Sequence, residues 1–172
     1  MKDVPYFLPL QEAIQLSLEH RLSPEIEHID LDEAHQRILA EDLLSKVNDP
    51  PFDNSAMDGF AVRFEDTQEA PSTLDIIATS QAAAGDEQLS VTSGQAVRIM
   101  TGAPVPEGAD AIIPIEACTI EGNNVTLNQP SKPHFIRKRG ENIAMDQVGL
   151  ERGCHLTPQS ISMCATMGYS SV

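Results

Sequence analysis

The chain has 172 residues, and a hydrophobic fraction of 41% is enough for the core of one domain or of two small ones. Its formal net charge is −15, and aromatic residues make up only 4%. This balance repels phosphate backbones and anionic membrane surfaces and offers few aromatic platforms for bases. Nucleic acids and membranes are therefore not expected as partners.

The first third of the chain is expected to be mostly helical. Residues 9–22 place apolar side chains at the spacing of one helical face. Residues 30–42 are predicted to form a second helix, with Asp30 and Glu33 in the positions of a capping box. Short strands are expected at 25–29 and 43–47.

From Asn48 to Gly140 the sequence changes to short strand-like pieces separated by turn residues. Strands are expected at 59–63, 74–79, 96–100, 110–115, 117–121, 124–127 and 134–138. The sequence EGNN at 121–124 indicates a hairpin. A helix is predicted again at 157–168, with Thr157 as its N-cap and Gly168 as its C-cap.

Helical segments at both ends and a β-rich middle predict an α+β fold. We expect a β-rich domain (49–140) to be inserted into a first domain built from 1–48 and 141–172. Because only four residues follow the last predicted helix, the chain is expected to be part of a longer protein.

The cysteines and the lack of targeting signals indicate a reduced, cytoplasmic setting. The three cysteines, Cys118, Cys154 and Cys164, have no CxxC spacing, so a disulfide framework and a zinc site are not expected. The acidic N-terminus is unlike a signal peptide, and no apolar run is long enough to span a membrane.

The first polar motif, PPFDNSAMDGFAVR, spans residues 50–63. On composition alone the favoured interpretation is a structured turn, in which Asn54 and Ser55 satisfy the backbone and Gly59 allows a bend. The alternative is a ligand site in which Asp58 holds Mg²⁺ through water. The glycine that follows Asp58 would let a ligand approach closely.

The second motif, VRIMTGAPVPEGADAIIPIE, spans residues 97–116. Local chemistry favours a β connection stiffened by prolines. The alternative is a polar loop in which Thr101 and the Gly102 amide point at a ligand. No base accompanies Thr101 in the motif, so we expect it to bind rather than to act as a nucleophile.

The third motif, KPHFIRKRGENIA, spans residues 132–144 and is basic in an otherwise acidic chain. Four basic residues fall within eight positions: Lys132, Arg137, Lys138 and Arg139. Two interpretations are equally favoured. The run is either a solvated surface or a site for a small phosphorylated ligand, since Arg binds phosphate in a bidentate manner.

In this order and spacing, the three motifs resemble the N-terminal part of the molybdopterin molybdenumtransferase (MoeA) family, whose animal homologue is the C-terminal part of gephyrin. The resemblance runs from the first helix to Gly168. It implies that the whole protein inserts molybdenum from molybdate into adenylylated molybdopterin, releases AMP and needs Mg²⁺. It also implies that 1–48 with 141–172 form an elongated mixed α/β dimerisation domain.

The resemblance further implies a homodimer whose substrate cleft is shared with an α/β domain of the other subunit. That domain is not part of this chain, so the 172 residues are expected to be inactive alone. In the family pattern Asp58 and Thr101 are the catalytic residues, and Asp58 is the possible Mg²⁺ ligand. The residues implied in substrate or anion binding are Ser55, Gly102, Arg137, Arg139 and Glu141. Many relatives read Gly-Glu-Asp where this chain has Asn142 in third place, and an amide cannot supply that negative charge.

Two other functions remain open at this point. A dimerising α+β piece with a β-rich appendage would also serve as a scaffold or interaction module. A free-standing anion-binding β domain would need only the basic motif.

Overall fold

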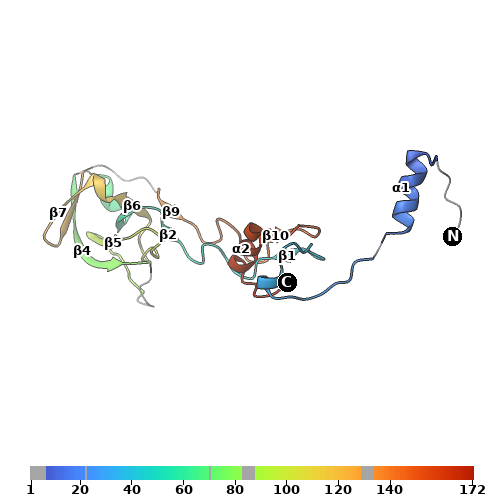
Figure 1. Ribbon diagram of the computed structural model, residues 1–172. Coiled ribbons are helices and arrows are strands. Elements are labelled where there is room, and N and C mark those ends of the chain that lie inside the picture. The colour runs from blue at the N-terminus through green and yellow to red at the C-terminus, as the bar shows by residue number, and fades with distance from the viewer. Residues whose placement is uncertain (1–6, 22, 70, 83–87, 129–133) are drawn as a thin grey trace.

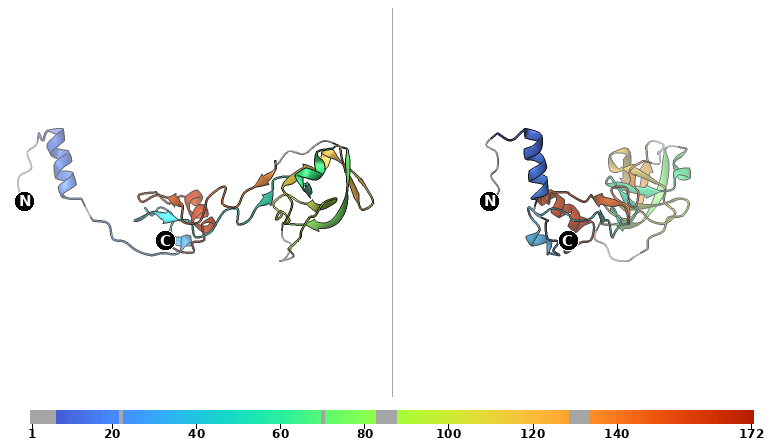
Figure 2. Two further views of the ribbon diagram at one scale, coloured as in Figure 1. Left: turned by 180° about the vertical axis from the view of Figure 1, so that it is seen from behind. Right: turned by 90° about the vertical axis from the view of Figure 1, so that its right-hand side faces the viewer.

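The protein is long and has three parts. The computed structural model describes residues 7–21, 23–69, 71–82, 88–128 and 134–172. Helix α1 (Leu10–Glu19) stands apart at one end, and a strand-rich lobe lies at the other end (Figure 1). A small lobe around helix α2 (Pro158–Thr166) lies between them, as the views in Figure 2 agree. We call the outer part (residues 54–137) the β lobe and the part around α2 (29–47 and 146–172) the middle lobe.

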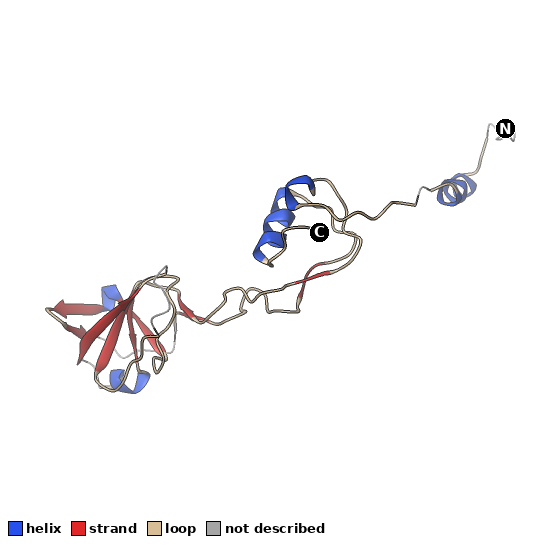
Figure 3. Cartoon of the chain, turned by 90° about the horizontal axis from the view of Figure 1, so that it is seen from below, coloured by secondary structure: helices blue, strands red, loops and turns tan. Residues whose placement is uncertain are grey.

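A six-stranded sheet forms the β lobe. Its strands are β3 (Gly59–Val62), β4 (Ser72–Ser80), β5 (Gln95–Ile99), β6 (Ala111–Pro114), β7 (Cys118–Glu121) and β8 (Asn124–Leu127). They lie in the order β6-β3-β5-β4-β8-β7, and Figure 3 shows that the sheet is curled. Strands β4 and β5 run parallel, whereas the other neighbours are antiparallel.

Strand β3 is buried on both of its faces. Because successive side chains of a strand point to opposite sides, Phe60 and Val62 pack into one apolar cluster and Ala61 packs into another. Its neighbour β6 divides in the same way, with Ile113 in the first cluster and Ile112 in the second. This explains why both strands read as continuous apolar runs rather than as alternating ones.

Six of the expected strands of the β lobe are confirmed within one or two residues, and the seventh is shorter. The predicted hairpin is also confirmed, because β7 and β8 pair from Glu121 and Asn124 outward. Strand β9 (Ile136–Arg137) is shorter than the predicted strand at 134–138 and pairs with β2 (Asn54–Ser55). Two 3-10 turns complete the lobe: Phe64–Thr67 and Ile115–Ala117.

The core of the middle lobe comes from both ends of the chain. The buried residues are Ala34, Leu39, Leu43, Leu156, Cys164 and Met167, and Ile143, which precedes the second segment of the lobe, packs into the same cluster. Strand β1 (Leu43–Leu44) pairs with β10 (Val148–Leu150), so segments about a hundred residues apart are joined. The predicted helix at the end is confirmed: the Thr157 hydroxyl accepts from the Ser160 N–H, and Gly168 follows with φ +90°.

The predicted helix at 30–42 is wrong. It is reduced to a 3-10 turn, Leu31–Glu33, and Asp30 makes no capping hydrogen bond with its side chain. The predicted strand at 25–29 does not form either. Tertiary pairing explains the missing helix, because the Leu39 N–H donates to Cys154 O. This backbone group is satisfied by a distant segment and is not available to a local helix. At the end of 25–29, Ile29 exchanges backbone bonds with Val172, and Asp30 forms only a single bridge with Ser171, so the pairing is too short for a strand.

Helix α1 confirms the first predicted helix, although the last residue of its predicted face, Leu22, lies outside the described residues. Its apolar positions are exposed: Leu10 is 75%, Ile14 51% and Leu18 54% exposed. A helix of ten residues is only marginally stable alone in water. Within the described residues, the apolar face of α1 has no cover.

The strand-rich, curled character of the fold and its few helices are established. The assignment of 49–140 as an inserted domain, and of 1–48 with 141–172 as a dimerisation domain, stays a prediction. In the described part of the chain we find no helix with the length and apolar character needed to cross a bilayer.

Gly59 generates a prediction about the β lobe. The expected role of this glycine in a bend is wrong. It begins β3, and a β-carbon there would collide with the carbonyl group of Ile113 on the adjacent strand β6. We expect Gly59→Ala to lower the free energy of unfolding by about 2 kcal/mol or more, measured by denaturant titration.

Gly122→Ala is the matched control, because Gly122 lies in the hairpin turn at φ +62° with open space around its α-carbon. Its backbone strain should cost only about 1 kcal/mol. An equal or smaller loss in Gly59→Ala would contradict the close approach of β3 and β6.

Candidate functional site

The sheet places Asp58 beside Thr101. Strands β3 and β5 are antiparallel, with Gly59 opposite Ile99, so the residue before β3 meets the turn after β5. Two short hydrogen bonds join them. The Thr101 N–H and the Thr101 hydroxyl both donate to Asp58 Oδ1, each at 2.7 Å. The two predicted catalytic residues are therefore in contact although 43 positions separate them.

The Asp58 carboxylate is ionised and open to ligands. The backbone hydrogen bond from Thr101 is the main cause that lowers the pKa of Asp58, and the Thr101 hydroxyl adds to it. Arg98 contributes a smaller electrostatic effect in the same direction. Both hydrogen bonds use Oδ1, which leaves Oδ2 without a partner among the described residues. Thr101 thus fixes the orientation of a carboxylate that has one free oxygen.

Ser55 and Gly102 are also brought together, but through their backbones. The Gly102 N–H donates to Ser55 O at 2.8 Å, and the Ser55 N–H donates to Ala103 O at 3.0 Å. The Ser55 hydroxyl donates to Met57 O at 2.6 Å, and Ser55 is only 1% exposed. These contacts fasten the first motif to the second, and the predicted ligand contacts of Ser55 and Gly102 stay predictions.

The basic motif is partly neutralised by the first motif. Lys138 Nζ forms an ion pair of 2.7 Å with Asp53 Oδ2, and the Arg139 N–H donates to Asp53 Oδ1 at 2.8 Å. The bond from Lys138 is the main cause that lowers the pKa of Asp53. Nothing local in the sequence reveals this pair, because its members are 85 positions apart.

The predicted anion-binding residues differ in how free they are. Arg137 Nη2 donates to Asn142 Oδ1 at 2.6 Å, and the Glu141 carboxylate accepts from the Lys138 N–H at 2.8 Å. In the described part of the chain, the Arg139 guanidinium has no hydrogen-bond or ion-pair partner. No hydrogen bond or ion pair between described residues joins Asp58 to this basic motif. Lys132, the fourth basic residue, lies outside the described residues.

The donor set around Asp58 suits Mg²⁺ only as part of a larger site. Among the described residues there is no group of three His, Cys, Asp or Glu side chains that would hold a metal. Mg²⁺ retains several waters and often binds through one or two carboxylates together with substrate phosphates. The chain supplies one such carboxylate, Asp58, and its free oxygen fits that limited role.

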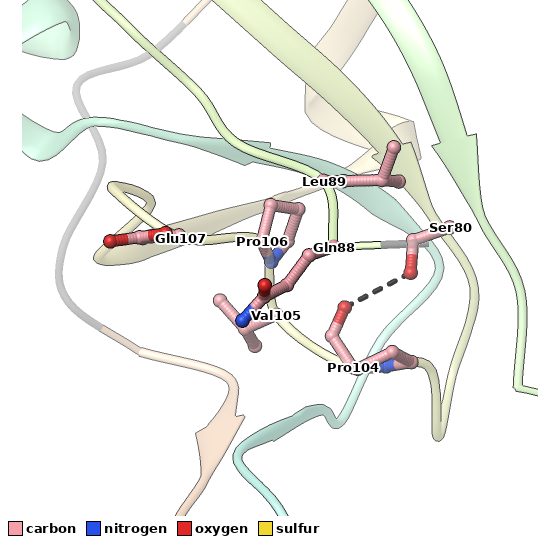
Figure 4. A pocket seen from close by; sticks show the side chains of 7 residues that line it. All are labelled: Ser80, Gln88, Leu89, Pro104, Val105, Pro106 and Glu107. Atoms are coloured by element: carbon pink, nitrogen blue, oxygen red, sulfur yellow. Dashed lines mark hydrogen bonds between the residues drawn. The ribbon is translucent and has the colours of Figure 1, made fainter. Parts of the chain in front are cut away.

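The proline loop after Thr101 borders a cavity of about 330 Å³. Figure 4 shows Ser80, at the end of β4, facing Pro104 across one wall of this cavity. The Ser80 hydroxyl donates to Pro104 O at 3.0 Å, and Ser80 is 5% exposed. This buried contact fixes the loop that carries Thr101 against the sheet.

Two of the cysteines are poorly suited to chemistry. Cys118, Cys154 and Cys164 are all free thiols. Burial, with a smaller effect of Glu116, raises the pKa of Cys118 to about 11, and burial also raises the pKa of Cys164. The thiolate is the nucleophilic form, and a raised pKa keeps these two thiols protonated. We therefore interpret Cys118 and Cys164 as packing residues.

The sequence matches a known family over nearly its full length. The family model of the MoeA N-terminal region (domain I and II) matches residues 8–168. Over 96% of its length, the chain is 42% identical to the molybdopterin molybdenumtransferase of Haemophilus influenzae and 37% identical to that of Bacillus subtilis. It spans 41% and 40% of the length of these two relatives.

The fold agrees with a solved structure of this class. A molybdopterin biosynthesis moeA protein from Pyrococcus horikoshii OT3 superposes with a TM-score of 0.88 at 34% identity, over 96% of this chain and 45% of that one. The chain belongs to the MoeA N-terminal family, which confirms the resemblance of the three motifs. It corresponds to the N-terminal region of molybdopterin molybdenumtransferases.

The two bonds to Asp58 generate a prediction. Replacing Thr101 by Val removes the hydroxyl but keeps the backbone N–H, which has the larger effect on Asp58. The pKa of Asp58 should therefore rise in Thr101→Val, but not to its ordinary value. Carboxyl NMR titration measures it. Thr101→Ser keeps the hydroxyl and should titrate like the original chain, and an unshifted Thr101→Val would show that the side-chain bond does not form.

Proposed function

We propose that this chain supplies the Asp58 and Thr101 half of an active site that inserts molybdenum from molybdate into adenylylated molybdopterin, with release of AMP. The observation that carries the proposal is an exposed, ionised carboxylate held by two bonds from Thr101. The names of the relatives support the reaction class. A carboxylate with this charge and one free oxygen can help to hold a hydrated divalent cation next to a phosphate.

The residues of this chain would act by positioning and by charge. Thr101 keeps the Asp58 carboxylate in one orientation, so the negative charge needs no reorganisation when the substrates bind. Arg137 and Arg139 would attract molybdate or the phosphate of the adenylylated pterin. When bound, Mg²⁺ supplies positive charge that stabilises the departing phosphate group.

We further propose that the 172 residues do not complete this reaction alone. The chain spans about two fifths of the relatives that it matches. The cleft would then be completed by an α/β domain of a partner subunit. A reduced, cytoplasmic setting for the reaction agrees with three free thiols.

A chimera tests the reaction directly. This chain would replace the matching N-terminal region of the Haemophilus influenzae relative, to which it is 42% identical. We expect insertion of molybdenum by the chimera, and a loss of about tenfold or more in kcat for Asp58→Asn, as is typical when a charged group in a site is neutralised. Thr101→Val should show a smaller loss.

Glu121→Gln at the hairpin is the control for the loss of one negative charge far from Asp58. An active chimera whose insertion rate is unchanged by Asp58→Asn would remove Asp58 from the mechanism. Insertion by the 172 residues alone would overturn the shared-cleft proposal while leaving the reaction in place.

A second proposal is that the chain is a dimerising module and forms a homodimer through the middle lobe. Strands β1 and β10 present Leu44 and Val148 as cross-strand partners, and these apolar side chains are 42% and 43% exposed. Met163 of α2, which contacts β10, is also 36% exposed. A two-fold interface needs one such self-complementary surface on each subunit.

Sedimentation of the 172 residues tests the dimer. We expect a concentration-dependent dimer, and Leu44→Glu should raise its dissociation constant at least tenfold because a charge would be buried without a partner. Ile120→Glu on β7 is matched in exposure, at 43%, and should leave dimerisation unchanged. A strict monomer at all concentrations would exclude this interface.

A further inference from the structure

Two antiparallel chain segments connect the middle lobe to the β lobe. We call residues 48–53 and 138–145 the connector. Its backbone hydrogen bonds run in both directions: the Gly140 N–H donates to Pro50 O at 2.9 Å, the Asn142 N–H to Asp49 O at 2.9 Å, and the Asp49 N–H to Ile143 O at 2.9 Å. The orientation of one lobe relative to the other depends on these few bonds.

The side chain of Asn142 bridges the connector. Its Oδ1 accepts from Arg137 Nη2 at 2.6 Å, and its Nδ2 donates to Asp49 Oδ2 at 2.7 Å. One partner is therefore a cation that needs an acceptor, and the other is a carboxylate that needs a donor. An amide carries both groups on one planar unit, whereas an ionised carboxylate offers acceptors only.

This geometry explains why an amide suits position 142 better than a carboxylate would. An aspartate at 142 would still accept from Arg137, but it would place a second negative charge against Asp49. The other charged groups of the connector do not relieve that repulsion, because Lys138 is paired with Asp53. Glu141, which accepts from the Lys138 N–H, adds a further negative charge. Arg139, also in the connector, donates its backbone N–H to Asp53, and no bond between described residues joins its guanidinium to Asp49.

We propose that Asn142 is a positioning residue that orients the Arg137 guanidinium and locks the connector by joining Arg137 to Asp49. Arginine has five N–H donors, and the bond from Arg137 to Asn142 uses one of them. The remaining donors are held in a fixed direction at the end of β9. The consequence for anion binding rests on the function proposed above, whereas the lock itself does not.

Amide hydrogen exchange of the 172-residue chain tests the lock where it acts. In Asn142→Asp at pH 7.5, we expect the protection factors of the Gly140 and Ile143 amides to fall about tenfold. Both amides donate across the connector, to Pro50 O and Asp49 O. Amides of the β7–β8 hairpin should keep their protection.

The loss should depend on pH with a defined sign. Two carboxylates in contact hold a proton to higher pH than isolated ones do. At acidic pH, one of the pair would be protonated and could donate to the other, so protection should return. As the pH rises and that proton leaves, protection should be lost again. A role that is only steric would give the same loss at both pH values.

A swapped double variant separates this bond from the general effect of a mutation. In Asp49→Asn with Asn142→Asp, the amide and the carboxylate exchange places: residue 49 donates and residue 142 accepts from both neighbours. We expect this variant to recover protection at pH 7.5 to within about threefold of the original chain. Asn128→Asp is the control for added charge, because its partner is a hydroxyl, Thr119 Oγ1, and it should show no pH-dependent loss.

The proposal is overturned if Asn142→Asp keeps full protection at pH 7.5, or if the swapped variant recovers nothing. Affinity for inorganic phosphate, measured by calorimetry, gives an independent result. A several-fold weaker affinity in Asn142→Asp, recovered by the swap, supports the positioning of Arg137. Reduced protection with unchanged phosphate affinity would support the lock and overturn the anion-binding role of Arg137.

Discussion

The antiparallel pairing of residues 49–55 with residues 136–143 is the constraint on which the rest of the molecule depends. It brings the chain back beside its own starting point after the β lobe is complete. Only because of this return can Leu39 and Leu43 share a core with Leu156 and Met167. The same pairing fixes β9 next to β2, from which the first motif leads to Asp58.

The carboxylates of Asp53 and Asp58 belong to the same motif but have different partners. Asp53 forms an ion pair with Lys138 and accepts from the Arg139 N–H, so its charge is neutralised within the protein. Asp58 is held by neutral donors of Thr101, and Arg98 adds only a small electrostatic effect, so most of its charge remains available to a cation. Asp53 is thus structural, whereas Asp58 is suited to binding. The difference arises from the partner that the fold places beside each carboxylate.

The two lobes also differ in how they are stabilised. The β lobe has strands that are buried on both faces, with Phe60 and Val62 on one side of β3 and Ala61 on the other. The middle lobe has short two-residue and three-residue strands, one helix and many single backbone bonds between distant segments. A lobe of that construction is sensitive to the connector, since Ile143 of the connector packs into the same core as Leu43 of the lobe.

The sequence by itself determined the family, most of the strands, the hairpin at 121–124 and the last helix. These features rest on local chemistry, such as apolar runs, turn residues and the Thr157 cap, or on three motifs specific enough to be recognised. The sequence also indicated Asp58 and Thr101, but not that Thr101 would hold Asp58. Only the tertiary structure decided the backbone conformation of residues 25–42, because their backbone groups pair with residues 153–172. It also decided the contacts of Asn142 and Asp53, whose partners Asp49 and Lys138 lie more than eighty positions away. Such contacts leave no local pattern, since they depend on how residues 49–55 pair with residues 136–143 after the chain returns.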